Sequence, residues 1–271
     1  MEENLCRVVD LRKFHDEQIS GKDDETQRLF SFLYGINFSD ILFADKVIMY
    51  EGDTERMYIQ ALIQSREDLA SLRAQYISYV QVGGAYAHVY KPLVIDTLRL
   101  KTVIITDLDY EKDSQTKTPE EISPLATTNS TLTNFFGEEV EGKPQPPTVG
   151  MLYELVSEES GVVSIGAESI GAVAFQTGKD GYARTFEEAI LCTFLGMPVW
   201  ETKPRTEWRK YRDDSFLKYW VPLKNETPDI RAIVASTSNG KTDFMYSLLL
   251  KKSFHEVVPP YISAALKWLA E

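Results

Sequence analysis

Short apolar segments alternate with helix-like segments along the first half of the chain. Strand-like composition, rich in β-branched and aromatic side chains, occurs at residues 46–50, 76–82 and 101–106. Between these segments, apolar side chains recur at helical spacing over residues 56–72 and 85–98. The order strand, helix, strand, helix, strand predicts an α/β fold with a doubly wound, mainly parallel sheet flanked by helices.

The pattern changes in the middle of the chain. Residues 112–148 are rich in Ser, Thr, Pro, Gly and Glu, which indicates a long polar insertion or mobile loop with one short helix. A strand is expected over residues 172–176, and a further strand over residues 230–235, a short and mostly apolar run. Helices are expected over residues 150–156, 182–190, 240–252 and 261–269.

The length of 271 residues allows one large domain or two smaller ones. We expect a helical lead-in over residues 1–44 and an α/β core over residues 45–200 that carries the insertion. Residues 201–271 form a third part, in which a helical and basic segment is followed by the last strand and helices. This third part is expected to complete the functional region.

The composition excludes several classes of protein and site. No run of about eighteen apolar residues is present, so no membrane span is predicted. The first residues carry acids where a secretory signal would be basic and then apolar, which favours a cytoplasmic protein. Two cysteines, Cys6 and Cys192, and three histidines are too few and too scattered for the usual zinc sites.

Acidic residues follow the first and third predicted strands. Glu51 ends the first strand, Gly52 allows a turn, and Glu55 lies in the first turn of the next helix. Asp107 and Asp109 follow the third strand. Because parallel strands share one carboxyl edge, we expect these carboxylates to converge in the crevice where open α/β sheets bind ligands. Such a cluster suits a hard divalent cation.

Simpler interpretations of these acids exist. Glu51 could be a surface residue at a strand end, Glu55 could only compensate the helix dipole, and the aspartates could be turn residues. An acid after an apolar strand is also found at the Mg²⁺-binding strand of P-loop NTPases. The tract from Asp109 to Glu120 has the outer acids of a calcium loop, but Ser114 stands where that loop requires glycine.

The formal net charge of −12 argues against a protein that holds nucleic acid on a broad basic surface. A carboxylate site is itself strongly negative until metal binds, so the charge does not exclude nucleic-acid chemistry. One segment, residues 201–224, is basic and aromatic. A solvated helix face is the commoner explanation for such a run, but on a nuclease it would track the DNA backbone. The candidate DNA contacts are Lys203, Arg205, Arg209, Lys210 and Arg212.

Two further motifs lie in the second half of the chain. Thr185 and Glu188 have the spacing of a capping box, which leaves Glu187 free to point elsewhere. Lys241 lies in a Gly-Lys-Thr sequence that is similar to the end of a P-loop. Ala235 stands where that pattern needs its first glycine, and the motif follows the acidic strand instead of preceding it. An NTPase is therefore disfavoured.

Four motifs in order resemble a known family. They are Glu51-Gly-x-x-Glu55, Asp107-x-Asp109, Arg184-Thr-Phe-Glu187 and Gly240-Lys-Thr-Asp-Phe244. The first two resemble a Toprim domain, the fold shared by type IA and II topoisomerases, bacterial primases and several nucleases. All four together resemble the OLD (overcoming lysogenization defect) nucleases, which include the Gabija-type phage-defence nucleases. The resemblance covers residues from about 40 to 252.

This resemblance implies a DNA endonuclease that uses two divalent ions, Mg²⁺ or Mn²⁺. It implies metal ligands at Glu51, Glu55, Asp107, Asp109 and Glu187. It implies catalytic roles for Glu51, Asp107, Asp109, Lys241 and Arg184. OLD proteins usually carry an ABC-type ATPase ahead of the Toprim region, and none is evident in the first 40 residues. We therefore expect an excised catalytic region or a lone Toprim protein. The expected partners are DNA and an ATPase domain or subunit. A homo-oligomer is a further possibility.

Two other classes share parts of this pattern. A topoisomerase or primase module would use Glu51, Asp107 and Asp109, but would need large partner domains. A non-catalytic Toprim scaffold would need only the fold. Covalent protein–DNA adducts or primer synthesis would favour the first class, and absence of cleavage with either metal would favour the second.

Overall fold

The computed structural model describes residues 8–111, 118–208, 228–236 and 240–271. A five-stranded sheet lies at its centre, in the order β2-β1-β3-β7-β6. Four neighbouring strands are parallel, and β6 pairs antiparallel with β7 at one edge. The fold class expected from the sequence is confirmed. The strands are β1 (Lys46–Tyr50), β2 (Ile77–Gln81), β3 (Lys101–Ile105), β6 (Val163–Ile165) and β7 (Gly171–Ala174).

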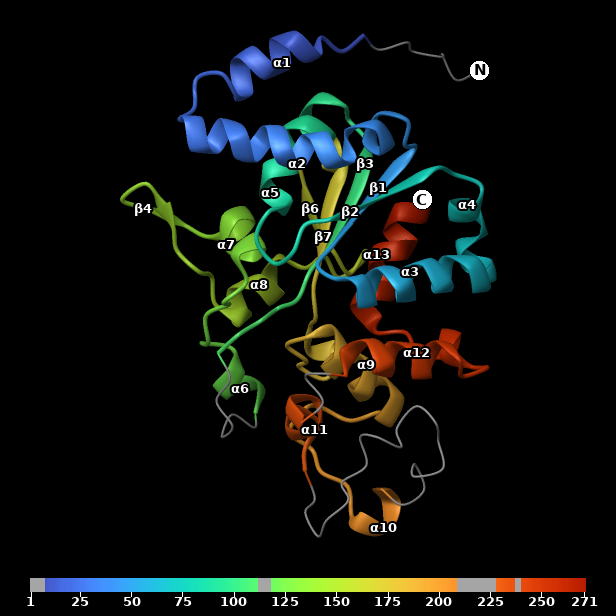
Figure 1. The fold of residues 1–271 in the computed structure, drawn as a ribbon. Coiled ribbons are helices and arrows are strands. Elements are labelled where there is room, and N and C mark those ends of the chain that lie inside the picture. The colour runs from blue at the N-terminus through green and yellow to red at the C-terminus, as the bar shows by residue number, and fades with distance from the viewer. Residues whose placement is uncertain (1–7, 112–117, 209–227, 237–239) are drawn as a thin grey trace.

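Helices cover both faces of the sheet and build two cores (Figure 1). Alternate side chains of β1 enter different cores, with Ile48 on one face and Val47 and Met49 on the other. Ile48 packs in the core of α3 (Asp53–Ser65), α4 (Ala70–Arg73) and α13 (Pro260–Ala270). The opposite core includes α1 (Leu11–Gln18), α2 (Asp24–Leu42), α5 (Ala87–Lys91), the π-helical turn η2 (Pro92–Thr97) and α8 (Val149–Leu155).

The polar insertion contains more structure than its composition predicts. Its described part forms α6 (Pro119–Ile122), α7 (Ser130–Phe136) and a hairpin of β4 (Glu139–Val140) and β5 (Lys143–Pro144). Two apolar side chains, Ile122 and Leu132, are fully buried in the core beside the sheet. Isolated apolar residues between polar ones give little periodic signal, so the composition predicts only one short helix here.

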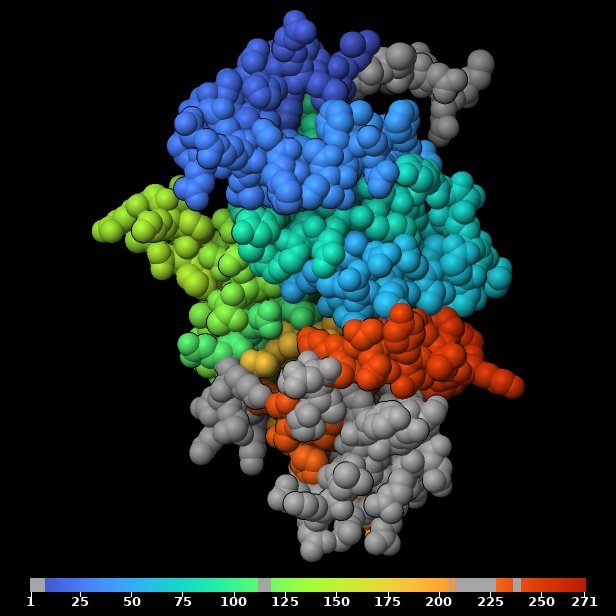
Figure 2. Space-filling model, viewed as in Figure 1, coloured from blue at the N-terminus to red at the C-terminus, as the bar shows by residue number. Residues whose placement is uncertain are grey.

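The α-helices between β7 and α13 lie beyond the carboxyl ends of the parallel strands (Figure 1). They are α9 (Phe186–Leu195), α10 (Arg205–Trp208), α11 (Ile230–Ser236) and α12 (Lys241–Leu249). In the space-filling view, α12 lies directly against α3 (Figure 2), in agreement with the contacts between these two helices. Lys241, the first residue of α12, is thereby brought to the same end of the sheet as the strand-end acids.

The strand expected at residues 230–235 is wrong, because this segment is helix α11. Asp229 begins the helix by accepting a hydrogen bond from the backbone N–H of Ala232, at 2.8 Å. Ile230 and Ile233 are buried in the core that α9 also enters, whereas Ala232 is exposed. A short apolar run fits a strand or a buried helical turn equally well, and tertiary packing decides here.

Helix α13 is fixed at both ends. The buried carboxylate of Asp180 accepts hydrogen bonds from the backbone N–H groups of Thr177 (2.9 Å) and Tyr261 (3.0 Å). At the other end, the Lys46 ammonium at the start of β1 donates to the carbonyl of Leu269. In the part of the chain that the structure covers, none of the helices combines the length and apolar content needed to cross a bilayer.

Candidate metal centre

Glu51 lies directly after β1, where the chain turns through Gly52 into α3. One of its carboxylate oxygens, Oε1, accepts hydrogen bonds from the backbone N–H of Asp107 (3.0 Å) and from Asn129 Nδ2 (2.8 Å). The Thr106 hydroxyl donates to the same oxygen. Three donors therefore hold Oε1 and fix the orientation of this carboxylate.

Asp107 and Asp109 follow β3, the neighbour of β1. Asp107 is 8% exposed, and its Oδ1 accepts a hydrogen bond from Gln176 Nε2 at 2.7 Å. Asp109 has a backbone φ of +42°, a left-handed conformation that is uncommon outside glycine. The structure brings these two aspartates together with Glu51, because each of the three offers a carboxylate oxygen within 4.8 Å of the others.

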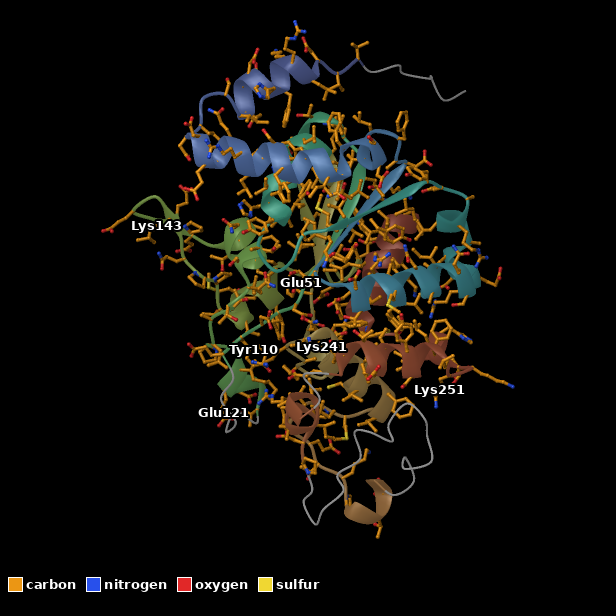
Figure 3. The ribbon with its side chains drawn as sticks, in the orientation of Figure 1. Glu51, Tyr110, Glu121, Lys143, Lys241 and Lys251 are labelled. Carbon is orange, nitrogen blue, oxygen red and sulfur yellow. The ribbon has the colours of Figure 1, made fainter. Side chains whose placement is uncertain are left out.

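Glu55, Glu187 and Lys241 lie beside this group. Glu55 is in the first turn of α3 and Glu187 in the first turn of α9, and both are buried, with 8% and 1% exposure. Lys241 Nζ is 3.0 Å from Glu187 Oε2. The other oxygen, Glu187 Oε1, is buried without a hydrogen-bond partner among the described residues. Figure 3 shows Glu51 at the end of the strands and Lys241 at the start of α12.

The crowding of acids changes their protonation. Burial, and then the negative charges of Glu51 and Glu55, raise the pKa of Asp107 well above its usual range. Burial and the nearby Glu51 raise the pKa of Asp109 to about 6. Burial raises the pKa of Glu55 to about 7, with Glu187 adding to the effect. For Lys241, burial lowers the pKa, but the surrounding carboxylates outweigh it and the net shift is upward.

The donor set fits hard divalent cations. All its ligand atoms are carboxylate oxygens, which suit Mg²⁺ and Mn²⁺ and do not distinguish them. Burial and mutual repulsion raise the pKa of these carboxyl groups, and Glu187 Oε1, which has no hydrogen-bond partner among the described residues, is available as a further candidate ligand atom. A bound cation would supply the missing charge.

Arg184 and Glu188 are tied to each other and to the loop that carries Asp109. Only half of the predicted capping box is present: Thr185 Oγ1 accepts a hydrogen bond from the backbone N–H of Glu188 at 3.4 Å, but the Glu188 side chain does not bond back to Thr185. Glu188 Oε2 accepts from the backbone N–H of Arg184 at 2.8 Å. Arg184 Nη1 donates to the carbonyl of Tyr110 at 3.0 Å, and its positive charge lowers the pKa of Asp109 against the larger effect of burial.

The candidate DNA contacts lie mostly beyond what the structure describes. Arg209, Lys210 and Arg212 are outside the described residues. Arg205 begins α10. Lys203 Nζ is 4.0 Å from Glu207 Oε2, and the Lys203 side chain is only 17% exposed.

Three residues at the centre were not identified from the sequence: Thr106, Asn129 and Gln176. Gln176 follows β7, the other neighbour of β3, so the same edge argument that grouped the acids could have found it. Thr106 lies between β3 and Asp107 and would be noticed only once Glu51 is placed. Asn129 has only the signal of a helix cap inside a polar segment.

Comparisons with known proteins point to one family. Residues 42–109 match the family model described as "Overcoming lysogenization defect protein-like, TOPRIM domain". A curated relative, Endonuclease GajA of Bacillus cereus (strain HuB5-5), is 29% identical over 291 residues. That alignment includes 99% of this chain but 38% of the relative, so the chain spans well under half of the length of GajA.

Solved structures of OLD proteins were also matched. The C-terminal region of the Burkholderia pseudomallei OLD protein is 20% identical, with a TM-score of 0.42 over 84% of this chain and 98% of that one. The C-terminal region of the Xanthomonas campestris pv. campestris OLD protein is 17% identical, with a TM-score of 0.41 over 84% and 95%. The matched segment 42–109 begins just before β1 and ends at Asp109, so it includes Glu51, Glu55 and Asp107. Residues 42–109 of this chain are therefore similar to the Toprim domain of OLD-like proteins.

Proposed function

We propose that this chain is the catalytic region of a metal-dependent DNA endonuclease. The observation that carries the proposal is the convergence of Glu51, Asp107 and Asp109, whose carboxylate oxygens lie within 4.8 Å of one another at the carboxyl edge of the sheet. The OLD-like Toprim match over the same residues supports it, as does the name of the relative, Endonuclease GajA.

Two divalent ions, Mg²⁺ or Mn²⁺, are proposed at this centre. Glu51, Asp107 and Asp109 would hold one ion, and Glu55 and Glu187 would contribute to the second. When bound, such ions lower the pKa of an attacking water and stabilise the charge on the leaving oxygen of a phosphodiester. The protein's own part is to hold these carboxylates in a fixed orientation and largely shielded from solvent.

Lys241 is proposed to stabilise negative charge on the reacting phosphate. Its ammonium is held by Glu187 at 3.0 Å, yet the side chain remains 49% exposed and faces open space as well as the acids. A fixed positive charge next to the reacting group is worth most where water is partly excluded. Arg184, whose charge acts on Asp109, is proposed to assist from the other side.

DNA is the proposed substrate, and an ATPase domain or subunit the proposed partner. The relative GajA extends well beyond the aligned part, which leaves room for such a domain. The basic residues Lys203, Arg205, Arg209, Lys210 and Arg212 are proposed to contact the DNA backbone.

Plasmid cleavage tests the proposal. Supercoiled DNA is incubated with the protein and Mg²⁺, Mn²⁺, Ca²⁺ or a chelator, and nicked and linear products are followed. Cleavage is expected with Mg²⁺ or Mn²⁺ and not with the chelator, and it should be lost in Asp107→Asn. A covalent protein–DNA adduct would favour a topoisomerase-type module instead. No cleavage of any DNA form with either metal would favour a non-catalytic scaffold.

A further inference from the structure

Three consecutive residues, Thr127, Thr128 and Asn129, bind the loop that carries the two aspartates. The Thr127 hydroxyl donates to the carbonyl of Leu108 at 2.6 Å. The Thr128 hydroxyl donates to the carbonyl of Asp109 at 2.6 Å, and its backbone N–H donates to the same oxygen. Asn129 Nδ2 donates to the carbonyl of Asp107 at 2.8 Å. Every carbonyl of the loop 107–109 thus accepts a hydrogen bond from the 127–129 segment.

These contacts stabilise an unusual backbone. Asp109 adopts a left-handed conformation, which costs free energy for a residue with a side chain. Its carbonyl is held twice by Thr128, and its N–H donates to the carbonyl of Arg184 at 3.1 Å. Both polar backbone groups of Asp109 are therefore fixed from outside its own loop.

Asn129 also acts on a second strand end. Its Nδ2 lies 2.8 Å from Glu51 Oε1, so one amide group contacts a carboxylate after β1 and a carbonyl after β3. The side chain is 3% exposed. Its Oδ1 accepts from the backbone N–H groups of Thr131 (2.8 Å) and Leu132 (3.2 Å) at the start of α7. Because the amide oxygen is held by donors, the NH₂ group must face the acids.

We propose that Thr127, Thr128 and Asn129 are positioning residues of the metal centre, which orient Glu51 and the 107–109 loop before a cation binds. The inference rests on the proposed function, since it assigns these residues to the same centre. Partners that hydrogen-bond metal ligands typically change metal affinity or activity by about 10- to 100-fold when removed. The polar insertion would then be a part of the active centre, although it lies outside the matched segment 42–109.

The test compares Asn129→Ser with the control Asn134→Ser in the full chain. Serine keeps an oxygen that can cap α7 but has no amide to donate to Glu51, so the change removes the positioning contact and retains the cap. Asn134 is an exposed residue of the same helix and donates to the carbonyl of Ser130. Calorimetric titration with Mn²⁺ is the first measurement, and plasmid cleavage at increasing Mn²⁺ is the second.

Asn129→Ser is expected to weaken Mn²⁺ binding by about tenfold or more. Its cleavage should recover partly at high Mn²⁺, because mass action compensates for weak binding but not for misfolding. Mn²⁺ affinity within about twofold of the control would overturn the proposal. If Asn129→Ser does not fold, the Mn²⁺ affinity of Thr128→Val is measured instead, because this change removes one exposed hydroxyl donor to the carbonyl of Asp109. Unchanged Mn²⁺ affinity of Thr128→Val would also overturn the proposal. Wild-type protein that binds Mn²⁺ without cleaving DNA would contradict the nuclease proposal alone.

Discussion

The two sides of the acidic centre are held in different ways. Around Glu51 and Asp107, neutral donors from Thr106, Asn129 and Gln176 bind one oxygen of each carboxylate. Around Glu187, a charged group holds the carboxylate, since Lys241 pairs with one of its oxygens. The other oxygen has no hydrogen-bond partner among the described residues. Neutral donors orient a carboxylate at any pH, whereas an ion pair depends on charge. The first side is therefore a fixed set of proposed metal ligands, and the second an adjustable one.

The largest expected effect is on the fixed side. Asp107→Asn should abolish cleavage, because it removes the charge of a central ligand while Oδ1 still accepts from Gln176. It should also raise the melting temperature of the metal-free protein above neutral pH, since the buried charge that repels Glu51 and Glu55 is gone. For a chain of this size, each kcal/mol of repulsion relieved corresponds to about 2 to 4 °C.

Calorimetry in chelator and plasmid cleavage measure the two effects of Asp107→Asn. Asp53→Asn is the matched control, because Asp53 is an exposed acid at the start of α3, paired with Arg56 at 3.0 Å. The control should keep cleavage and melt close to wild type. An Asp107→Asn protein that unfolds would show that Asp107 is structural.

On the adjustable side, Lys241→Ala should lower the cleavage rate by roughly a hundredfold, the usual scale for losing one preorganised charge. Mn²⁺ binding should persist, because the fixed ligand set is intact. ATP should bind neither protein. The exposed Lys143→Ala on β5 is the control and should cleave normally. ATP binding that disappears with Lys241 would support an NTPase and contradict the nuclease assignment.

The pH should separate metal binding from stability. Asp109 and Glu55 have pKa values of about 6 and about 7 in the folded protein, above the ordinary range of about 4 for carboxyl groups. Folding favours their protonated forms, so the stabilisation that these two groups contribute to the metal-free protein should be fully present below about pH 4. It should fall as the pH rises toward 7. Mn²⁺ needs the ionised forms, so its affinity should rise over the same window.

Titration calorimetry in two buffers of different ionisation enthalpy measures this linkage. Mn²⁺ binding at pH 6 should release protons, and release should become small near pH 8. Equal heats in both buffers at pH 6 would show that the two carboxyls are already ionised, contrary to the crowding in the structure.

The smallest effect is expected away from both sides of the centre. Replacing Arg209, Lys210 and Arg212 by alanine should weaken DNA binding modestly and flatten its salt dependence, by about one unit of slope for each DNA phosphate that is no longer neutralised. Fluorescence anisotropy over a range of salt concentrations gives the slope. A slope equal to that of wild type would favour the alternative interpretation of this segment as a solvated helix face, without changing the proposed role of the acids.

Sequence reasoning succeeded where chain direction alone decides position. Glu51, Asp107 and Asp109 follow neighbouring parallel strands, so their convergence follows from the strand order. Glu187 and Lys241 were named only by resemblance to a family, because the docking of α9 and α12 beyond the sheet depends on packing between distant segments. Their 3.0 Å ion pair had no local signal.

The failures have the same physical cause. Residues 230–236 form a helix because Ile230 and Ile233 pack into a core that distant parts of the chain build. The local sequence pattern does not indicate that core. Asn129 lies in a segment of low hydrophobicity, and its contacts reach back to residues 51 and 107. A polar side chain that works by hydrogen bonds leaves no periodic pattern to detect.

The anchoring of α13 has a consequence for how the molecule assembles. Asp180 holds its first turn, Lys46 holds its last, and its apolar face packs against β3 and β7. All three attachments join parts of the chain that are far apart in sequence, and such contacts slow folding because a long loop must close first. We therefore expect the part of the sheet that α13 covers, over β3 and β7, to remain exposed until this helix docks. The carboxyl edge, where β3 leads to Asp107 and Asp109, would therefore gain its final geometry late, after the contacts that are local in sequence have formed.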